Sequence, residues 1–194
     1  MISRFKMGDK PTAQLISNPT LLETFRFGGV FGMEHIREGK VIHEESFHNV
    51  FTDEGLNHML NVLFANASQE DSWYICTFQD NVTPVGGDTY VSKGFTETNT
   101  GIDETYRPTY TDVVSSKTVT NSASKATFTY NTTLTIYGAA ILGYPGTDSS
   151  NYGRTKGNNN AGGVYLCGGK FAASRAVVDD DVINVTYAMT SADT

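Results

Sequence analysis

One amphipathic helix, followed by a long run of short alternating strands, is the feature that most limits how this chain can fold. The apolar residues of the helical segment, Thr52 to Asn66, are Leu56, Met59, Leu60, Leu63 and Phe64. They recur three or four residues apart, which is one face of a 3.6-residue period. Thr52 is a natural N-cap, and acidic residues follow it in the first turn, where the helix dipole favours them. We therefore predict a helix over residues 52–66 that lies on a sheet, with His58 pointing away from that sheet.

After this helix the sequence alternates with the two-residue period of β-strands. Ala126, Phe128 and Tyr130 alternate with threonines, and the apolar residues from Ile183 to Met189 share one face of another strand. Charged residues are only 18% of the chain, against about a quarter in typical proteins. Short strands separated by turn residues predict a mainly β protein, a jelly-roll-like sandwich or barrel with one amphipathic helix.

The chain divides into an arm and one domain. Residues 1–24 lack a sustained period and contain Pro11 and Pro19, so we expect an extended N-terminal arm. The aromatic and glycine-rich cluster at residues 25–32 is typical of a bent strand where backbones approach closely. We predict an arm and lead-in over 1–38 and a single β domain over 39–194.

Two long polar segments, residues 80–111 and 148–163, interrupt the strand pattern. The first is broken by prolines and glycines, and the second is rich in Asn and Gly. The second has too few apolar residues to pack against itself, so we expect it to be exposed and mobile unless a partner covers it.

Charge and cysteine content restrict the functional class. A formal charge of -7 and a pI near 5.0 leave no basic stripe for phosphates, so we expect no direct nucleic-acid binding. No apolar run reaches the roughly 18 residues of a membrane span, and residues 1–10 do not resemble a signal peptide. Cys76 and Cys167 each lie in an apolar strand-like run, which favours buried free thiols over a disulfide. We therefore expect the chain to be made and kept in a cytosol.

The residues that carry enzyme chemistry form no recognisable set. The four histidines give no His-x-x-x-His pair, the cysteines give no Cys-x-x-Cys pair, and the Gly-x-Ser-x-Gly nucleophile motif is absent. The acidic run 179–181 could bind calcium if its oxygens converged, but it lacks the spaced Asp-x-Asp-x-Asp-Gly pattern. A hairpin turn between apolar runs is the favoured interpretation. We predict a protein that is not an enzyme and uses no cofactor or metal.

Four short blocks carry a resemblance to a known group of proteins. They are Asn49 to Asn57, Trp73 to Ile75, Tyr106 to Pro108, and Asn121 to Ser124. The segment from Asp181 to Tyr187 looks like the closing strand of the same group, although Asp180 stands where Gly is usual. In these blocks the chain resembles small tailed-bacteriophage virion proteins, several of which are capsid decoration or cement proteins.

The resemblance implies a jelly-roll-like domain, a trimer, that sits on the major capsid protein and supplies no catalytic residues. We therefore predict a structural virion protein at the capsid surface, synthesised in the host cytoplasm, which cements or decorates the capsid. The alternative is a tail-associated protein that recognises a host glycan or protein through the two long loops.

Aromatic residues are the predicted partner-binding positions. Phe25, Phe27 and Phe31 lie near the arm and are candidates for lattice or inter-subunit contact, with ordinary core packing as the alternative. Tyr106 and Tyr152 lie in the two loops, where aromatic rings stack on sugars, and solvated turns are the alternative there.

Overall fold

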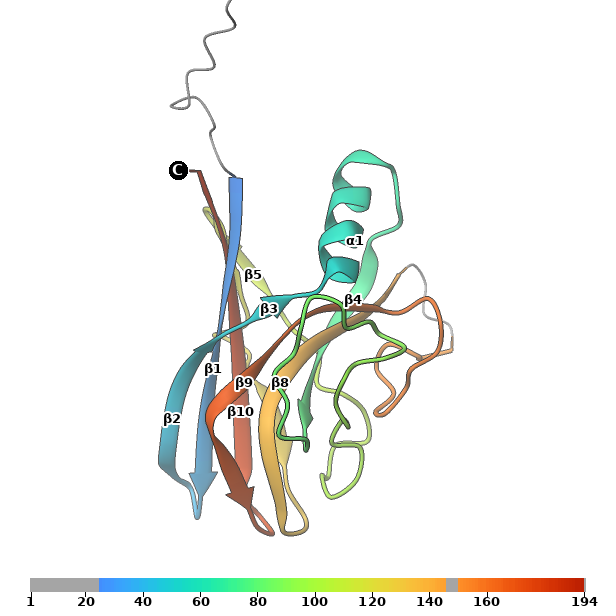
Figure 1. The fold of residues 1–194 in the computed structure, drawn as a ribbon. Helices are drawn as coiled ribbons and strands as arrows, with labels where there is room; N and C mark the ends of the chain where they lie inside the picture. The colour runs from blue at the N-terminus through green and yellow to red at the C-terminus, as the bar shows by residue number, and fades with distance from the viewer. Residues whose placement is uncertain (1–24, 146–149, 194) are drawn as a thin grey trace, which may run out of the picture.

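A computed structural model describes residues 25–145 and 150–193, which form two antiparallel β-sheets and one α-helix (Figure 1). The first sheet has the order β2 (Lys40–His48), β1 (Phe25–Arg37), β10 (Val182–Asp193), β6 (Thr118–Thr120) and β5 (Val113–Ser115), and β7 (Ala126–Thr129) also pairs with β10. The second sheet has the order β3 (Val50–Phe51), β9 (Val164–Val177), β8 (Leu134–Pro145) and β4 (Glu70–Phe78). The predicted mainly β class is confirmed, while the jelly-roll connectivity stays a prediction.

One hydrophobic core lies between the two sheets. Buried residues from both contribute to it, including Phe31, Phe128, Ile141, Phe171 and Tyr187. The predicted alternation is confirmed in β7 and β10, since Ala126, Phe128, Ile183 and Val185 are all buried while their neighbours face outward. The period of the sequence therefore located the core-facing sides of these strands.

Strand β1 corrects the predicted domain boundary at residue 39. It lies between β2 and β10 inside the first sheet, so residues 25–38 belong to the β domain. Phe31 is completely buried and its ring lies 5.2 Å from that of Phe47 and 4.6 Å from that of Tyr187. Gly29 leaves room for Tyr187, because a Cβ at this position would lie 2.1 Å from the tyrosine Oη. The predicted arm, residues 1–24, lies outside the described residues.

The acidic run 179–181 forms a turn, as predicted, but the turn is not a hairpin. It carries the chain from β9 in the second sheet to β10 in the first. Asp181 is buried and accepts hydrogen bonds from Arg37 Nε at 2.8 Å and from the Val178 amide at 2.8 Å. The Arg37 hydrogen bonds hold the pKa of Asp181 well below its usual range. This carboxylate therefore joins β1 to the turn.

The outer face of the second sheet is covered by the long segment between β4 and β5. A second cluster of buried residues lies there: Cys76, Tyr90, Ala140, Leu142 and Tyr165, with Phe95 packed against them. Cys76 and Cys167 are both buried free thiols, as predicted. Burial raises the pKa of Cys167 to about 12, so the thiol stays protonated at neutral pH. The predicted loop 80–111 is thus a packed layer of the domain.

Candidate interaction surfaces

Helix α1 (Asp53–Phe64) is fixed at its first turn and projects beyond the second sheet (Figure 1). Thr52 caps it, as predicted, since its hydroxyl accepts a hydrogen bond from the Gly55 amide at 2.9 Å. Gly55 is buried against β9, where a Cβ would lie 2.5 Å from the carbonyl oxygen of Leu166. Only a glycine lets the helix backbone approach the strand this closely.

Within the part of the chain that the structure describes, the apolar face of α1 is largely uncovered. The exposed fractions are 36% for Leu56, 52% for Leu60, 62% for Leu63 and 82% for Phe64. Met59 is the member of the face that packs against the core. The prediction that this face lies on a sheet is therefore wrong for most of its length, because the helix contacts the sheets mainly through Gly55, His58 and Met59.

His58 also differs from its predicted position. Its side chain is only 12% exposed, and its imidazole contacts the buried carboxylate of Glu70 on β4. Burial raises the pKa of Glu70, against the opposing effect of His58. His58 thus touches β4, while its helix neighbours Asn57 and Asn61 are exposed.

An apolar groove of about 370 Å³ continues from the exposed helix face. Its apolar lining consists of Phe27, Met59, Val62, Leu63, Trp73 and Met189, and His58, Gln69 and Glu70 also line it. We call the exposed face of α1, made by Leu56, Leu60, Leu63 and Phe64, together with this groove, the apolar cap. Since Leu63 belongs to both parts, the cap is one continuous surface.

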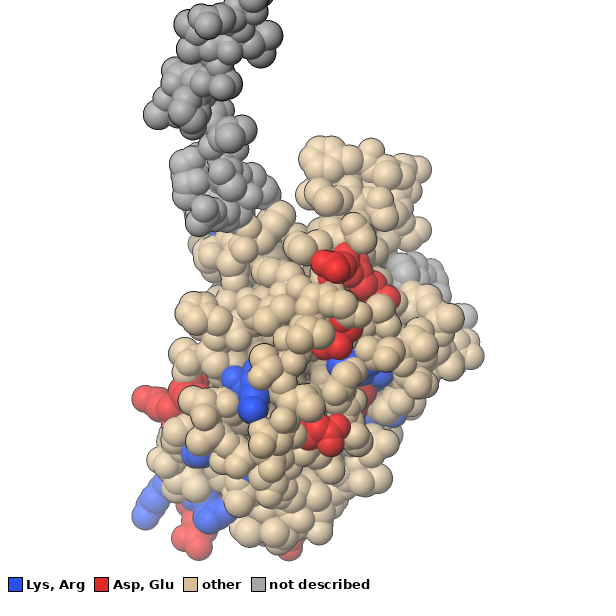
Figure 2. All heavy atoms as spheres, viewed as in Figure 1, with Lys and Arg blue, Asp and Glu red and all other residues tan. Residues whose placement is uncertain are grey.

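The projecting part of the cap carries no charge. Residues 55–64 of α1 include no Lys, Arg, Asp or Glu. Figure 2 shows the same on the visible face, where the protruding end of the molecule is free of charged side chains and acidic residues gather near its base. An uncharged apolar projection is unusual on a chain with a formal charge of -7.

A second surface is built around a buried ion pair within the long loops. Arg107 donates two hydrogen bonds to Glu97, from Nε to Oε1 and from Nη2 to Oε2, both at 2.7 Å. The side chains are 1% and 3% exposed. Burial alone would lower the pKa of Arg107, but the bonds and charge of Glu97 raise it, so the guanidinium remains charged.

Arg107 also fixes the second loop. It donates hydrogen bonds to the carbonyl oxygens of Gly153, at 2.5 Å, and Asn158, at 3.0 Å. Tyr90 adds a hydrogen bond from its hydroxyl to the carbonyl of Tyr152 at 3.0 Å. The prediction that this loop stays mobile without a partner did not foresee these anchors. These hydrogen bonds hold the loop in place although it has few apolar residues.

The two predicted tyrosines meet at this loop surface. Tyr106 is 41% exposed, and the guanidinium of Arg154 lies 4.0 Å from its ring centroid. Tyr152 is half-buried, with its ring 5.5 Å from that of Tyr144. The structure therefore brings together Tyr106 and Tyr152, the two partner-binding positions predicted in the loops, in one loop cluster.

The three predicted phenylalanines separate. Phe27 is half-buried and lines the groove of the apolar cap. Phe31 is a core residue, which removes it from the candidate contact surface. The backbone of Phe25 pairs with Asp193 at the start of β1, and its side chain lies outside the described part of the structure.

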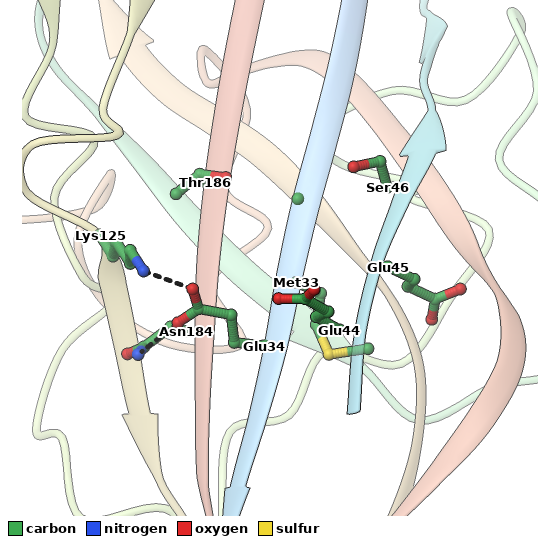
Figure 3. A pocket seen from close by; sticks show the side chains of 9 residues that line it. Met33, Glu34, Glu44, Glu45, Ser46, Lys125, Asn184 and Thr186 are labelled. Carbon is green, nitrogen blue, oxygen red and sulfur yellow. Dashed lines mark hydrogen bonds and ion pairs between the residues drawn. The ribbon is translucent and has the colours of Figure 1, made fainter. Parts of the chain in front are cut away.

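A third feature is a polar hollow of about 400 Å³ on the outer face of the first sheet (Figure 3). Lys125 and Asn184 both point toward the carboxylate of Glu34 and bond to it. The hydrogen bond from Lys125, followed by that from Asn184, lowers the pKa of Glu34. The central acid of this hollow is therefore already paired within the protein.

Two kinds of feature are absent from the described residues, 25–145 and 150–193. No group of three or more His, Cys, Asp or Glu side chains among them is arranged to hold a metal ion. Over the same residues, no helix has the length and apolar character needed to cross a membrane.

Sequence reasoning did not identify the exposed helix face or the Arg107–Glu97 pair as features of a surface. The helix period was visible, but it does not say what covers the face. Arg107 and Glu97 stand apart in a polar loop, and nothing in their spacing indicates a buried pair.

Comparisons with models of protein families, with curated proteins and with solved structures find no significant match to this chain.

Proposed function

We propose that this protein is a non-catalytic structural protein of a bacteriophage virion, which binds the major capsid protein and cements or decorates the capsid surface. The observation that carries the proposal is the apolar cap. Its large side chains project from the domain without charge, and the rest of the described chain, residues 25–145 and 150–193, leaves them largely exposed. Large apolar projections of this type are typical of protein interaction sites, and a structural protein of a virion contacts its own copies as well as the capsid on assembly.

The sequence blocks that resemble tailed-phage virion proteins support the proposal. They coincide with positions that hold this fold together. Thr52 caps α1, Arg107 anchors both loops, and Asn121 is buried and accepts a hydrogen bond from the Tyr187 amide at 2.7 Å. A resemblance carried by such residues concerns the architecture of the domain, as expected for proteins that share a structural role.

Co-sedimentation tests the proposal. Purified protein is mixed with capsids of the same phage assembled without it, and the pellet is quantified over a range of concentrations. We expect saturable binding at a fixed ratio to the major capsid protein. Binding that stays at background at the highest concentration would refute capsid binding. Capsids already carrying the protein serve as the control, because their sites are filled.

The loop surface favours one second candidate, a tail-associated protein that recognises a host glycan or protein. Because buried bonds fix the loops, Tyr106 and Arg154 are held in place before a ligand arrives, which lowers the entropic cost of binding. Glycan-array binding that is lost in Tyr106→Ser would support this candidate. An array with no signal for the wild-type protein, together with capsid co-sedimentation, would exclude glycan recognition in favour of the first function.

A further inference from the structure

The exposed face of α1 has the geometry of a helix-packing seam. Leu56, Leu60 and Leu63 follow one another at intervals of four and three residues, and Phe64 extends the face at its end. This is the spacing with which one helix packs against another. The helix has 12 residues, so the seam can be up to about 18 Å long.

The area of the seam equals that of the largest apolar patch on a typical monomer. At roughly 200 Å² for a fully exposed large side chain, the four exposed fractions correspond to roughly 450 Å². This lies within the range of about 300 to 600 Å² for the largest apolar patch on a typical monomer, which is often a functional surface. It is also more than half of the roughly 800 Å² that each partner contributes to a standard interface. The adjoining groove residues can supply much of the remainder.

The lack of charge on the seam indicates which molecule covers it. A partner selected by charge would need complementary groups on the seam, and residues 55–64 offer none. Two copies of this acidic chain repel each other on average, but at the seam no like charges are brought together, and Asn57 and Asn61 beside it can hydrogen-bond to their counterparts. A surface of this kind is complementary to itself, as an isologous contact between two copies requires.

We propose that the occupant of the seam is helix α1 of a second copy of this chain, so that copies associate through their α1 helices about a symmetry axis. The contact covers Leu60, Leu63 and Phe64 of each copy. This inference deepens the proposed function and rests on it for the place of the oligomer in a virion. Self-association itself is measured on the purified protein without capsids.

Sedimentation velocity of the full chain tests the inference with two double variants. Leu60→Gln with Leu63→Gln changes the seam, and glutamine keeps helix propensity. Val41→Thr with Ile42→Thr is the control. Those residues are 53% and 50% exposed, close to the 52% and 62% of the leucines, and they lie near the β1–β2 turn at the opposite end of the molecule (Figure 1).

We expect the wild type and the control to form an oligomer, and the seam variant to dissociate about a hundredfold more readily or more. Circular dichroism should show that both variants remain folded, since the altered side chains are exposed. A monomeric wild type, or an oligomer that the seam variant does not weaken, would overturn the inference. Either result leaves capsid co-sedimentation as a separate measurement of the proposed function.

Disulfide trapping separates a second copy from other occupants. Both native cysteines are buried, so Leu63→Cys provides the chain with one exposed thiol. We expect mild oxidation to link two chains through Cys at this position, while Val41→Cys gives far less product. If residues 1–24 of the same chain covered the seam, no linked dimer would form, and the inference would fail.

Discussion

Replacing Glu97 by glutamine removes the negative charge that compensates Arg107 inside the loop layer. The wild-type pair has two hydrogen bonds of 2.7 Å, and both side chains are almost completely buried. Glutamine keeps one acceptor but turns an N–H group toward the guanidinium, so one short bond is replaced by two opposed donors. The change therefore leaves a buried, uncompensated positive charge.

The magnitude follows from the burial. Breaking a buried ion pair by removing one partner costs about 3 to 5 kcal/mol. The carbonyl oxygens of Gly153 and Asn158 and the hydroxyl of Tyr90 still accept bonds from Arg107, which places the expected loss at the lower end. We expect Glu97→Gln to lower the free energy of unfolding by about 3 kcal/mol, a large share of the roughly 5 to 15 kcal/mol of a typical domain.

Urea unfolding followed by the fluorescence of Trp73, the single tryptophan, measures this loss. Glu34→Gln is the matched control, because Glu34 pairs with Lys125 at a partly exposed site, where an ion pair contributes at most about 1 kcal/mol. A loss below about 1 kcal/mol for Glu97→Gln, equal to that of the control, would refute the reasoning from burial. It would show that water reaches the Arg107 guanidinium.

The double variant Glu97→Met with Arg107→Met extends the test. It removes both charges, so we expect a smaller loss of stability than in Glu97→Gln. It also removes the bonds to Gly153 and Asn158, which hold the second loop. Trypsin should then cleave after Arg154 or Lys156 faster than in the wild type. An unchanged cleavage rate would show that Arg107 does not anchor this loop.

Two further substitutions test other parts of the fold. Because Arg37 lowers the folded-state pKa of Asp181, its carboxylate contributes stability above its unfolded pKa, near 4, and loses it as the pH falls toward the lower folded value. Asp181→Asn should lower the free energy of unfolding by about 2 kcal/mol at pH 7. The free energy of unfolding of this variant should also change less with pH below about pH 4 than that of the wild type. The same pH dependence in both proteins would contradict this. Gly55→Ala should destabilise by about 1 to 3 kcal/mol despite the better helix propensity of alanine, because its Cβ would meet the Leu166 backbone. Asn57→Ala, on an exposed position of the same helix, is the control and should not destabilise, and a stabilised Gly55→Ala would show that α1 can shift on β9.

The sequence by itself determined the local elements of this protein. The N-cap at Thr52, the helix period, the core-facing residues of β7 and β10, and the buried cysteines follow from side-chain chemistry and from spacing. These features depend on neighbours within a few residues along the chain. A period of 3.6 or of 2 reports them directly.

Only the tertiary structure decided what each face meets. The apolar face of α1 has the pattern of a buried helix, yet Leu60, Leu63 and Phe64 stay exposed, because the helix contacts the sheets through other positions. Arg107 and Glu97 resemble solvated loop charges, yet the chain folds the two loops around them until both are buried. Periodicity shows which residues share a face, whereas the cover of that face comes from segments distant in sequence, and for the α1 seam we propose that it comes from another copy of the chain.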